Sequence, residues 1–244
     1  MRIERLRVSN LRCFASAELI PHPAFNWLVG PNGAGKTTLL EAIFLLSHGR
    51  SFRPGGSGLL VRLGEACCDV YAELAHDSSS KHRIGLQRGP SGWRARMDGA
   101  ALASLLPVLE GCAVACFEPG SSALVSGPAE ARRRFLNWGV FHVEHESISV
   151  WRNYRRALGQ RNALLRGRRD AEEFGFWESE LERAAVRLEG WRRRYLDALS
   201  PHVAPLAAEF LPELGRSSLV YRPGWHTDAA LSEQLSLGRP KDFM

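Results

Sequence analysis

The stretch Gly30-Pro31-Asn32-Gly33-Ala34-Gly35-Lys36-Thr37 satisfies the phosphate-loop pattern G-x-x-x-x-G-K-[ST]. Its three glycines allow positive φ angles, so backbone N–H groups can approach phosphate oxygens closely. We expect Lys36 to reach the β- and γ-phosphates and the Thr37 hydroxyl to ligate Mg²⁺, with Thr38 available on the α-phosphate side. The predicted nucleotide site consists of Gly30, Pro31, Asn32, Gly33, Ala34, Gly35, Lys36, Thr37 and Thr38.

The residues around the loop predict a strand before it and a helix after it. The apolar run Phe25–Val29 is typical of a short buried strand. After the loop, apolar residues recur at helical spacing, and Gly49 is a typical helix end. These helix positions are Leu39, Leu40, Ile43, Phe44 and Leu46. A phosphate cradle requires this order of strand, loop and helix.

Length and composition indicate a globular protein with one substantial core or two modest ones. The chain has 244 residues, of which 45% are hydrophobic and 24% charged. No stretch approaches the roughly 18 to 20 apolar residues of a membrane span, and Met1–Arg5 lacks the apolar segment of a secretory signal. We therefore expect a soluble, cytoplasmic protein with no membrane partner. The five cysteines have no metal-ligand spacing, which predicts reduced and mostly buried thiols.

The positive charge is concentrated in one part of the sequence. The formal net charge is +6, yet residues 132–169 contain ten arginines and only two acidic residues. A localised basic stretch is typical of a protein that binds a polyanion, nucleic acid first and an anionic membrane surface second. The alternative is a solvated helical face whose arginines pair with acids elsewhere or with helix C-termini.

Residues after about 146 read as a helical hairpin. Trp151, Tyr154, Leu158 and Leu165 fall on one face of a helix from 146 to 166, which Gly167 ends. From Trp177 to Tyr195, apolar residues alternate at spacings of four and three, as in a coiled-coil seam. The two helices should pack antiparallel with their aromatic residues in the core, and Pro201 and Pro205 should break or kink the second helix.

Several longer sequence motifs, spread over nearly the whole chain, resemble those of a known family. Two short strands are expected over 2–14 and 17–20, before Asn-x-x-Gly-Lys-Thr-Thr-Leu-Leu-Glu-Ala-Ile at 32–43. This layout resembles the heads of SMC-like ABC ATPases, and within that group the bacterial RecF recombination-mediator family. Segments similar to motifs of this family also occur at residues 48–53, 117–119, 127–139 and 154–165. The chain departs from the family pattern at Pro54, and at Asn137 where aspartate is usual.

The resemblance implies an α/β fold: an ABC-type P-loop ATPase head, with a mixed sheet and a phosphate-loop helix, plus an α-helical lobe. We expect the head to begin over 1–130, the lobe to span 131–215, and 216–244 to return to the head. The implied ligands are ATP and Mg²⁺. The expected DNA contacts are the arginines Arg132, Arg133, Arg134, Arg152, Arg155, Arg156 and Arg161.

The resemblance also implies how such a protein acts. An ATP-driven homodimer of heads would clamp single-stranded or junction DNA, help load recombinase at gaps with other mediator proteins, and support the SOS response. The intact family member would be a weak DNA-dependent ATPase. The sequence does not identify which residues would catalyse ATP hydrolysis.

Two further segments partly resemble ATPase motifs. We expect Cys112–Glu118 to form a strand with Glu118 near the site, but Pro119 follows it where a Walker B strand carries a second acid. Residues 235–241 superficially match the ABC signature, although Pro240 should obstruct the helix that starts there. With neither motif evident, we expect the chain to lack appreciable ATP hydrolysis and to be less stable than a longer relative.

Two other functions remain open from the sequence. The chain could be an SMC-like head whose partner is a protein, in which case DNA binding would be absent or insensitive to salt. It could also be another P-loop kinase or GTPase. A GTPase would need a guanine-reading Asn/Thr-Lys-x-Asp motif, which the sequence does not contain.

Overall fold

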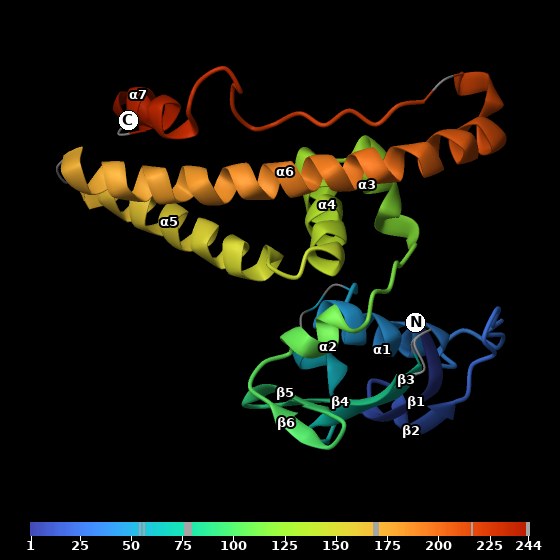
Figure 1. Cartoon of the computed structure of the whole chain (residues 1–244). Coiled ribbons are helices and arrows are strands. Elements are labelled where there is room, and N and C mark those ends of the chain that lie inside the picture. Colours follow the sequence, from blue (N-terminus) through green and yellow to red (C-terminus); the bar gives the residue numbers. More distant parts are fainter. Residues whose placement is uncertain (54, 56, 76–79, 168–170, 216, 243–244) are drawn as a thin grey trace. The chain divides into compact units, whose positions relative to one another are not determined.

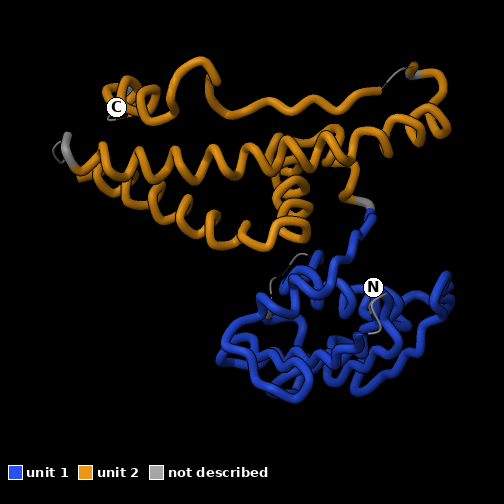
Figure 2. The backbone as a smooth tube through the Cα atoms, viewed as in Figure 1, with its two compact units in different colours: residues 1–118 blue, residues 119–244 orange. Residues whose placement is uncertain are grey.

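The structure is a computed structural model that describes residues 1–242 except 54, 56, 76–79, 168–170 and 216. It divides into two compact units, Met1–Glu118 and Pro119–Met244 (Figure 2). Each unit is described by itself.

The first unit is built on a six-stranded sheet in the order β2-β1-β3-β4-β5-β6 (Figure 1). Its strands are β1 Arg2–Leu11, β2 Phe14–Leu19, β3 Cys68–Ala75, β4 Lys81–Gly89, β5 Gly92–Met97 and β6 Ala100–Leu102. The two strands expected before the loop are β1 and β2. All pairings between neighbouring strands among the described residues are antiparallel. Of the mixed sheet that we expected, these residues form the antiparallel part.

One face of this sheet carries the core, because alternate residues of a strand point to opposite faces. The buried Val70 and Ala72 of β3 and Leu86 of β4 lie in one cluster with Ala42 and Leu45 of helix α1 (Lys36–His48). Helix α2 (Leu106–Glu110) packs beside α1 on the same side of the sheet (Figure 1). A 3₁₀ turn, η1, spans Ser57–Leu60. The other face of the sheet carries mostly polar side chains.

Two expected strands do not form. Residues 21–30 have no regular structure, and Phe25, Trp27 and Val29 are 70%, 76% and 80% exposed instead of buried. Residues 112–118 also lack strand structure. A strand requires a hydrogen-bonded neighbour, and none of the described strands pairs with either segment. Both strand predictions were therefore wrong for this structure.

The second unit is helical. Its short elements are η2 Pro119–Ser122, α3 Ala123–Ser126 and η3 Pro212–Leu214, and its longer helices are α4 Ala129–Val143, α5 Ser147–Gly167, α6 Ala171–Phe210 and α7 Leu231–Asp242. The helix expected over 146–166 is confirmed as α5, and α5 packs against α6 as the predicted hairpin (Figure 1).

The hairpin core follows the predicted seam. Leu188 and Trp191 of α6 are buried with Val150 of α5, and Trp151 and Tyr154 pack against them. The aromatic stripe is therefore core, as expected. We expected Pro201 and Pro205 to break or kink this helix. The break does not occur, since α6 stays helical through both prolines, and the helix bends toward its C-terminal end (Figure 1).

Residues 217–242 lie in the second unit, where α7 packs on α6. We expected 216–244 to return to the ATPase head. Helix α7 includes Pro240, but it begins at Leu231, before the segment that resembles the ABC signature, so no helix starts at that segment. The proline stands in the last turn, where it removes a single N–H donor. None of the helices among the described residues is long and apolar enough to cross a membrane.

The five cysteines are free thiols, but they are not mostly buried as expected. Cys68 and Cys112 are buried, and loss of solvation raises the pKa of these thiols to about 11 and about 12. Cys13 and Cys116 are exposed. They lie on a turn and in an irregular segment, respectively.

Candidate nucleotide-binding site and arginine surface

The phosphate loop has the backbone that its glycines predict. Gly33 and Gly35 have φ angles of 84° and 92°, which side chains rarely tolerate. A Cβ atom on Gly35 would also lie 2.3 Å from Cζ of Phe14, so the β1–β2 hairpin packs directly against the loop. Helix α1 begins at Lys36, immediately after Gly35, and Gly49 ends it in a left-handed conformation as expected.

The loop presents unsatisfied donors at the start of α1. Within the described residues, the backbone N–H groups of Gly33, Gly35, Lys36 and Thr37 have no acceptor. They lie at the positive end of the helix dipole, where an anion is stabilised. This cluster of free donors fits the phosphate oxygens of a nucleotide.

The side chains of the loop divide into two groups. Lys36 Nζ donates to the carbonyl oxygens of Gly30 and Pro31 at 2.7 and 2.8 Å, which leaves one of its three donors for a phosphate. Thr37 is exposed and its hydroxyl has no partner among the described residues, so it is free to ligate Mg²⁺. Thr38 is buried, with Oγ1 3.8 Å from Sγ of Cys13. The Thr38 hydroxyl thus faces the β1–β2 hairpin, and its expected contact on the α-phosphate side stays a prediction.

A buried carboxylate anchors the loop helix, and the sequence analysis missed it. Glu41 of α1 is 0% exposed and accepts hydrogen bonds from Arg12 Nε and Nη2 at 2.5 and 2.6 Å. Ser51 Oγ also donates to it, and Arg53 Nη1 lies 3.8 Å away. Hydrogen bonding to Glu41 raises the pKa of the Arg12 guanidinium. The signal was a single acidic residue inside the apolar run 39–46.

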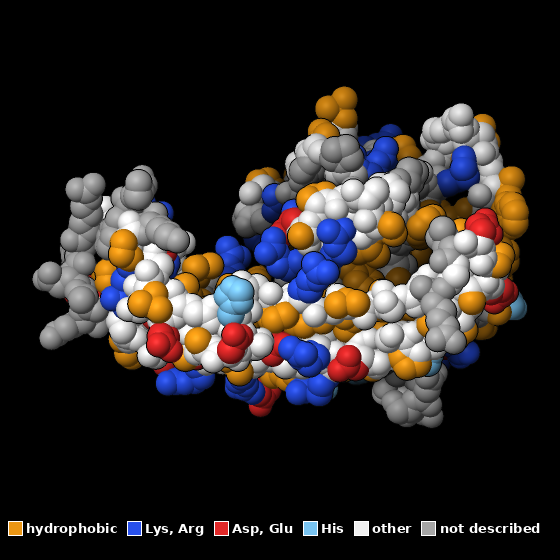
Figure 3. Space-filling model, turned by 90° about the horizontal axis from the view of Figure 1, so that it is seen from above, with side chains coloured by type: hydrophobic (Ala, Val, Ile, Leu, Met, Phe, Trp, Pro, Cys, Tyr) orange, Lys and Arg blue, Asp and Glu red, His pale blue; other side chains and the backbone are white. Residues whose placement is uncertain are grey.

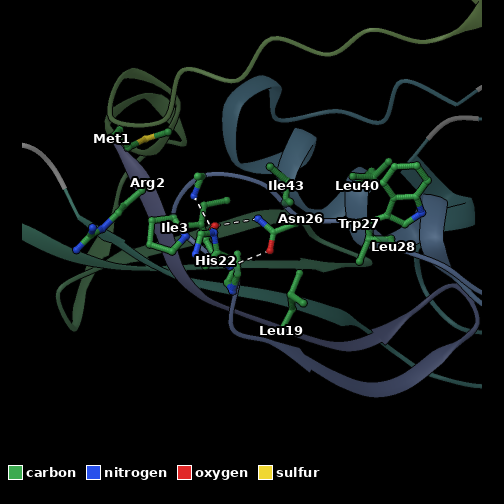
Figure 4. Close-up of a pocket in the computed structure, with 13 residues that line it drawn as sticks. Met1, Arg2, Ile3, Leu19, His22, Asn26, Trp27, Leu28, Leu40 and Ile43 are labelled. Atoms are coloured by element: carbon green, nitrogen blue, oxygen red, sulfur yellow. Dashed lines mark hydrogen bonds between the residues drawn. The ribbon is translucent and has the colours of Figure 1, made fainter.

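A cavity of about 580 Å³ lies beside α1 in the same unit (Figure 4). Trp27, Leu28, Leu40 and Ile43 line one part of it, so its wall includes the run expected to be a strand. The Asn26 side chain is held by the backbone N–H and carbonyl of His22 at 2.8 and 2.9 Å. With that amide engaged and most of the wall apolar, the cavity offers few polar groups to orient a nucleotide.

The seven arginines expected to contact DNA have different environments. Arg152 and Arg155 are exposed on α5, and neither has a side-chain partner among the described residues. Arg166 on the same helix is equally free. The guanidinium of Arg156 lies 5.7 Å from the centre of the Trp177 ring.

The three arginines of α4 are exposed but engaged. Arg132 Nη1 donates to carbonyl oxygens at the end of α3, the shortest bond being 3.0 Å to Gly127. Arg133 and Arg134 share the carboxylate of Glu130, and these hydrogen bonds lower the pKa of Glu130. Acidic and basic side chains are likewise interspersed over the face of the molecule in Figure 3. Sequence charge alone could not separate paired from free arginines.

Arg161 does not belong to the candidate DNA surface. Its side chain is 6% exposed, and its Nε and Nη2 atoms lie 3.1 Å from Glu178 and 2.7 Å from Asp242. Arg239 of α7 pairs with the same Glu178. Position 161 completes the apolar stripe at 151, 154, 158 and 165, and that spacing could have identified it as buried.

Asn137, where the resemblance leads one to expect aspartate, still accepts hydrogen bonds. Nε and Nη2 of Arg192 donate to its Oδ1 atom at 3.0 and 2.7 Å. The position therefore joins α4 to α6 through a neutral acceptor instead of a charged one.

Comparisons with known proteins agree with this fold and site. A family model described as an AAA domain matches residues 5–84. The DNA replication and repair protein RecF of Stenotrophomonas maltophilia is 42% identical over 99% of this chain and 68% of its own length. The corresponding protein of Xanthomonas axonopodis pv. citri is 40% identical over 99% of this chain and 67% of its own. The chain thus spans about two thirds of the length of these relatives.

Solved structures show the same fold. The structure described as the recombination mediator protein RecF-ATP in the RecFOR pathway has a TM-score of 0.83 and 22% identity, covering 98% of this chain and 66% of that one. A second, described as RecF-ATPrS, has a TM-score of 0.83 and 22% identity, covering 99% and 68%. The expected fold class, a P-loop ATPase head with a helical lobe, is confirmed. On these sequence identities, the chain belongs to the RecF family.

Proposed function

We propose that this chain is the ATP-binding part of a DNA replication and repair protein that acts as a recombination mediator. The observation that carries the proposal is the phosphate loop, with free backbone donors at the start of α1 and Lys36 held over the loop. Relatives that share 40% of the sequence are named for DNA replication and repair. The structural neighbours are described as RecF with ATP or ATPrS.

The residues of the loop have separate tasks in this proposal. The free N–H groups of Gly33 and Gly35 and the Lys36 ammonium bind phosphate oxygens, and Thr37 ligates the metal. A bound Mg²⁺ would neutralise part of the phosphate charge. Glu41 holds the helix that begins with Lys36 against Arg12, so the donors stay oriented before the nucleotide arrives.

The helical unit supplies the DNA contacts. Arg152, Arg155 and Arg166 lie exposed on α5, their guanidinium groups have no side-chain partner among the described residues, and together they form what we call the α5 arginines. Arg156 adds a fourth charge beside Trp177. Arg132, Arg133 and Arg134 contribute less, since each must exchange an existing partner for a phosphate. The contacts would be to the phosphate backbone, because the sequence contains neither a helix-turn-helix signature nor zinc-finger spacing for reading bases.

Family membership extends the proposal to the whole protein. We propose an ATP-dependent homodimer that holds single-stranded or junction DNA, and other mediator proteins as partners, as the description of a RecFOR pathway suggests. Help in loading recombinase at gaps, support of the SOS response and a cytoplasmic site of action belong to the same proposal.

DNA binding measured against salt concentration tests the proposal. Replacing the three α5 arginines by glutamine should weaken duplex and single-stranded DNA binding and reduce the slope of log K against log salt by about 0.9 per lost duplex contact. The matched control replaces three arginines that already pair with acids, Arg2, Arg183 and Arg193, with the same loss of charge. DNA binding that is absent or insensitive to salt would instead support an ATPase head with a protein partner.

A further inference from the structure

A second basic surface lies on the sheet of the first unit. Strands β4 and β5 and their turn, residues 81–97, contain five basic residues and no acidic residue. These are Lys81, Arg83, Arg88, Arg94 and Arg96. Charge averaged along the sequence points to residues 132–169 and does not reveal this second cluster, because acidic residues elsewhere in the first unit offset its positive charge.

Three of these arginines share the face of the sheet that points away from α1. Ile84, Leu86 and Ala95 are buried on the core face, so the intervening Arg83, Arg94 and Arg96 point to the opposite face. In the β4–β5 register, Arg96 pairs with Gly85, and Arg94 pairs with Gln87. Residues two apart on a strand lie about 6.8 Å apart, and neighbouring strands about 4.8 Å apart. The backbone positions that carry the three arginine side chains therefore lie close together on the sheet.

None of these guanidinium groups forms an ion pair with a carboxylate among the described residues, although the backbone N–H of Arg83 and, less strongly, its charge contribute to the lowered pKa of Asp98. Among the described residues, the Arg83 and Arg96 side chains have no hydrogen-bond or ion-pair partner, and Arg94 makes one 3.5 Å bond to Ser91 Oγ. The other end of the same sheet differs, since Arg5 and Arg7 both pair with Glu18.

The nearby acids are already engaged. Glu73, which faces Arg83 across the β3–β4 pairing, accepts a hydrogen bond from Tyr71 at 3.0 Å and lies 3.8 Å from Arg5. Asp69 accepts from Gln87 at 3.0 Å. Asp98 accepts the backbone N–H of Arg83 and bonds to His82, both at 2.8 Å.

Gly85 leaves room in the middle of this surface. It lies opposite Arg96 and between Arg83 and Gln87 on β4. A Cβ atom built on it meets nothing within 4 Å, so the space above the strand is open. An extended polyanion can therefore reach the backbone level of the sheet between arginine side chains.

We propose that Arg83, Arg94 and Arg96, here called the sheet-face arginines, form a second DNA-contacting surface that binds the phosphate backbone. The inference rests on the proposed function, and it adds a DNA site on the ATPase unit to the one on the helical unit. An anionic membrane is the less suitable partner, because no exposed large hydrophobic side chain occurs among the described residues from 64 to 116. Membrane-surface binding uses such side chains together with charge.

The first test replaces all three sheet-face arginines by glutamine in the full chain. If each contacts one phosphate, the slope of log K against log salt for duplex DNA should fall by about 2.7, and by about 2 for a single strand. The advantage of the wild type over the variant should then shrink about 40-fold between 50 and 200 mM salt. The control with Arg2, Arg183 and Arg193 replaced has the same net charge and should keep the wild-type slope.

Gly85 provides a test that does not remove any native side chain. Gly85→Arg should strengthen DNA binding and Gly85→Glu should weaken it, with both proteins as stable as the wild type, because the site is open. Equal effects of the two substitutions on DNA affinity would overturn the inference, since a structural disturbance would not depend on the sign of the charge.

The outcomes separate this inference from the proposed function. If the wild type binds DNA and the sheet-face variant matches its control, the second surface is wrong while the proposed function stands. If the wild type does not bind DNA at all, both fail. If the sheet-face variant loses binding to vesicles of anionic phospholipid but keeps its affinity for DNA, the partner is a membrane and the inference is wrong.

Discussion

Arg12→Met should strongly destabilise the first unit, because it leaves the Glu41 carboxylate buried without its main partner. Glu41 is 0% exposed, and Arg12 supplies both of its short guanidinium hydrogen bonds. Removing one member of a buried ion pair costs about 3 to 5 kcal/mol. Ser51 and Arg53 remain near the carboxylate, so we expect the lower end, about 3 kcal/mol. For a unit of this size, that corresponds to a decrease in Tm of about 12 °C.

The assay is calorimetry of the full chain, combined with hydrogen exchange of β1 and α1 to assign the loss to the first unit. The double variant Arg12→Met/Glu41→Leu should recover most of the stability, because it removes the buried charge together with its partner. Glu41→Leu alone should cost less than Arg12→Met, since the Arg12 side chain is 16% exposed and can reach water. A Tm for Arg12→Met within 2 °C of the wild type, or a double variant less stable than Arg12→Met, would refute the reasoning.

Three further predictions concern packing, hydrogen bonding and thiol chemistry. Gly139→Ala should cost about 1 to 3 kcal/mol in urea unfolding, because its Cβ would lie 2.1 Å from the Tyr195 ring; unchanged stability would show that the helices can separate there. Asn137→Asp should stabilise the α4–α6 contact by about 1 kcal/mol, since a charged acceptor binds its arginine partner more strongly; a lower urea midpoint would contradict this. Cys68 and Cys112 should resist alkylation at pH 8 while the two exposed thiols react, because burial raises the pKa of Cys68 to about 11 and that of Cys112 to about 12. Peptide mapping that finds Cys112 modified in the folded protein would contradict this prediction.

Local features of this fold could be predicted from the sequence. The phosphate loop, its helix and the end of that helix at Gly49 depend on residues within one short segment. The α5–α6 hairpin was also predictable, because the helical period marks the buried face directly.

Features that depend on distant partners could not be predicted. The run 25–29 has the composition of a strand, but it forms one only if another strand hydrogen-bonds to it. The ion pairs of Glu41 and Arg161 join residues 29 and 17 positions apart; local patterns mark the two residues as buried, but they do not identify the partners. Counting charges along the chain therefore placed the buried Arg161 with the exposed arginines and overlooked the cluster that pairing of β4 with β5 creates.

The measurement that tests the central claim most directly is calorimetric titration of the full chain with Mg²⁺ and ATP. The wild type should bind one ATP per chain, and Lys36→Ala should bind at least tenfold more weakly, because it loses the charge that reaches the phosphates. Lys81→Ala is the matched control, since Lys81 pairs with Glu4 on the sheet and should leave the affinity for ATP unchanged. Equal affinity of the wild type and Lys36→Ala, or no ATP binding by the folded wild type, would contradict the assignment of residues 30–37 as the nucleotide site.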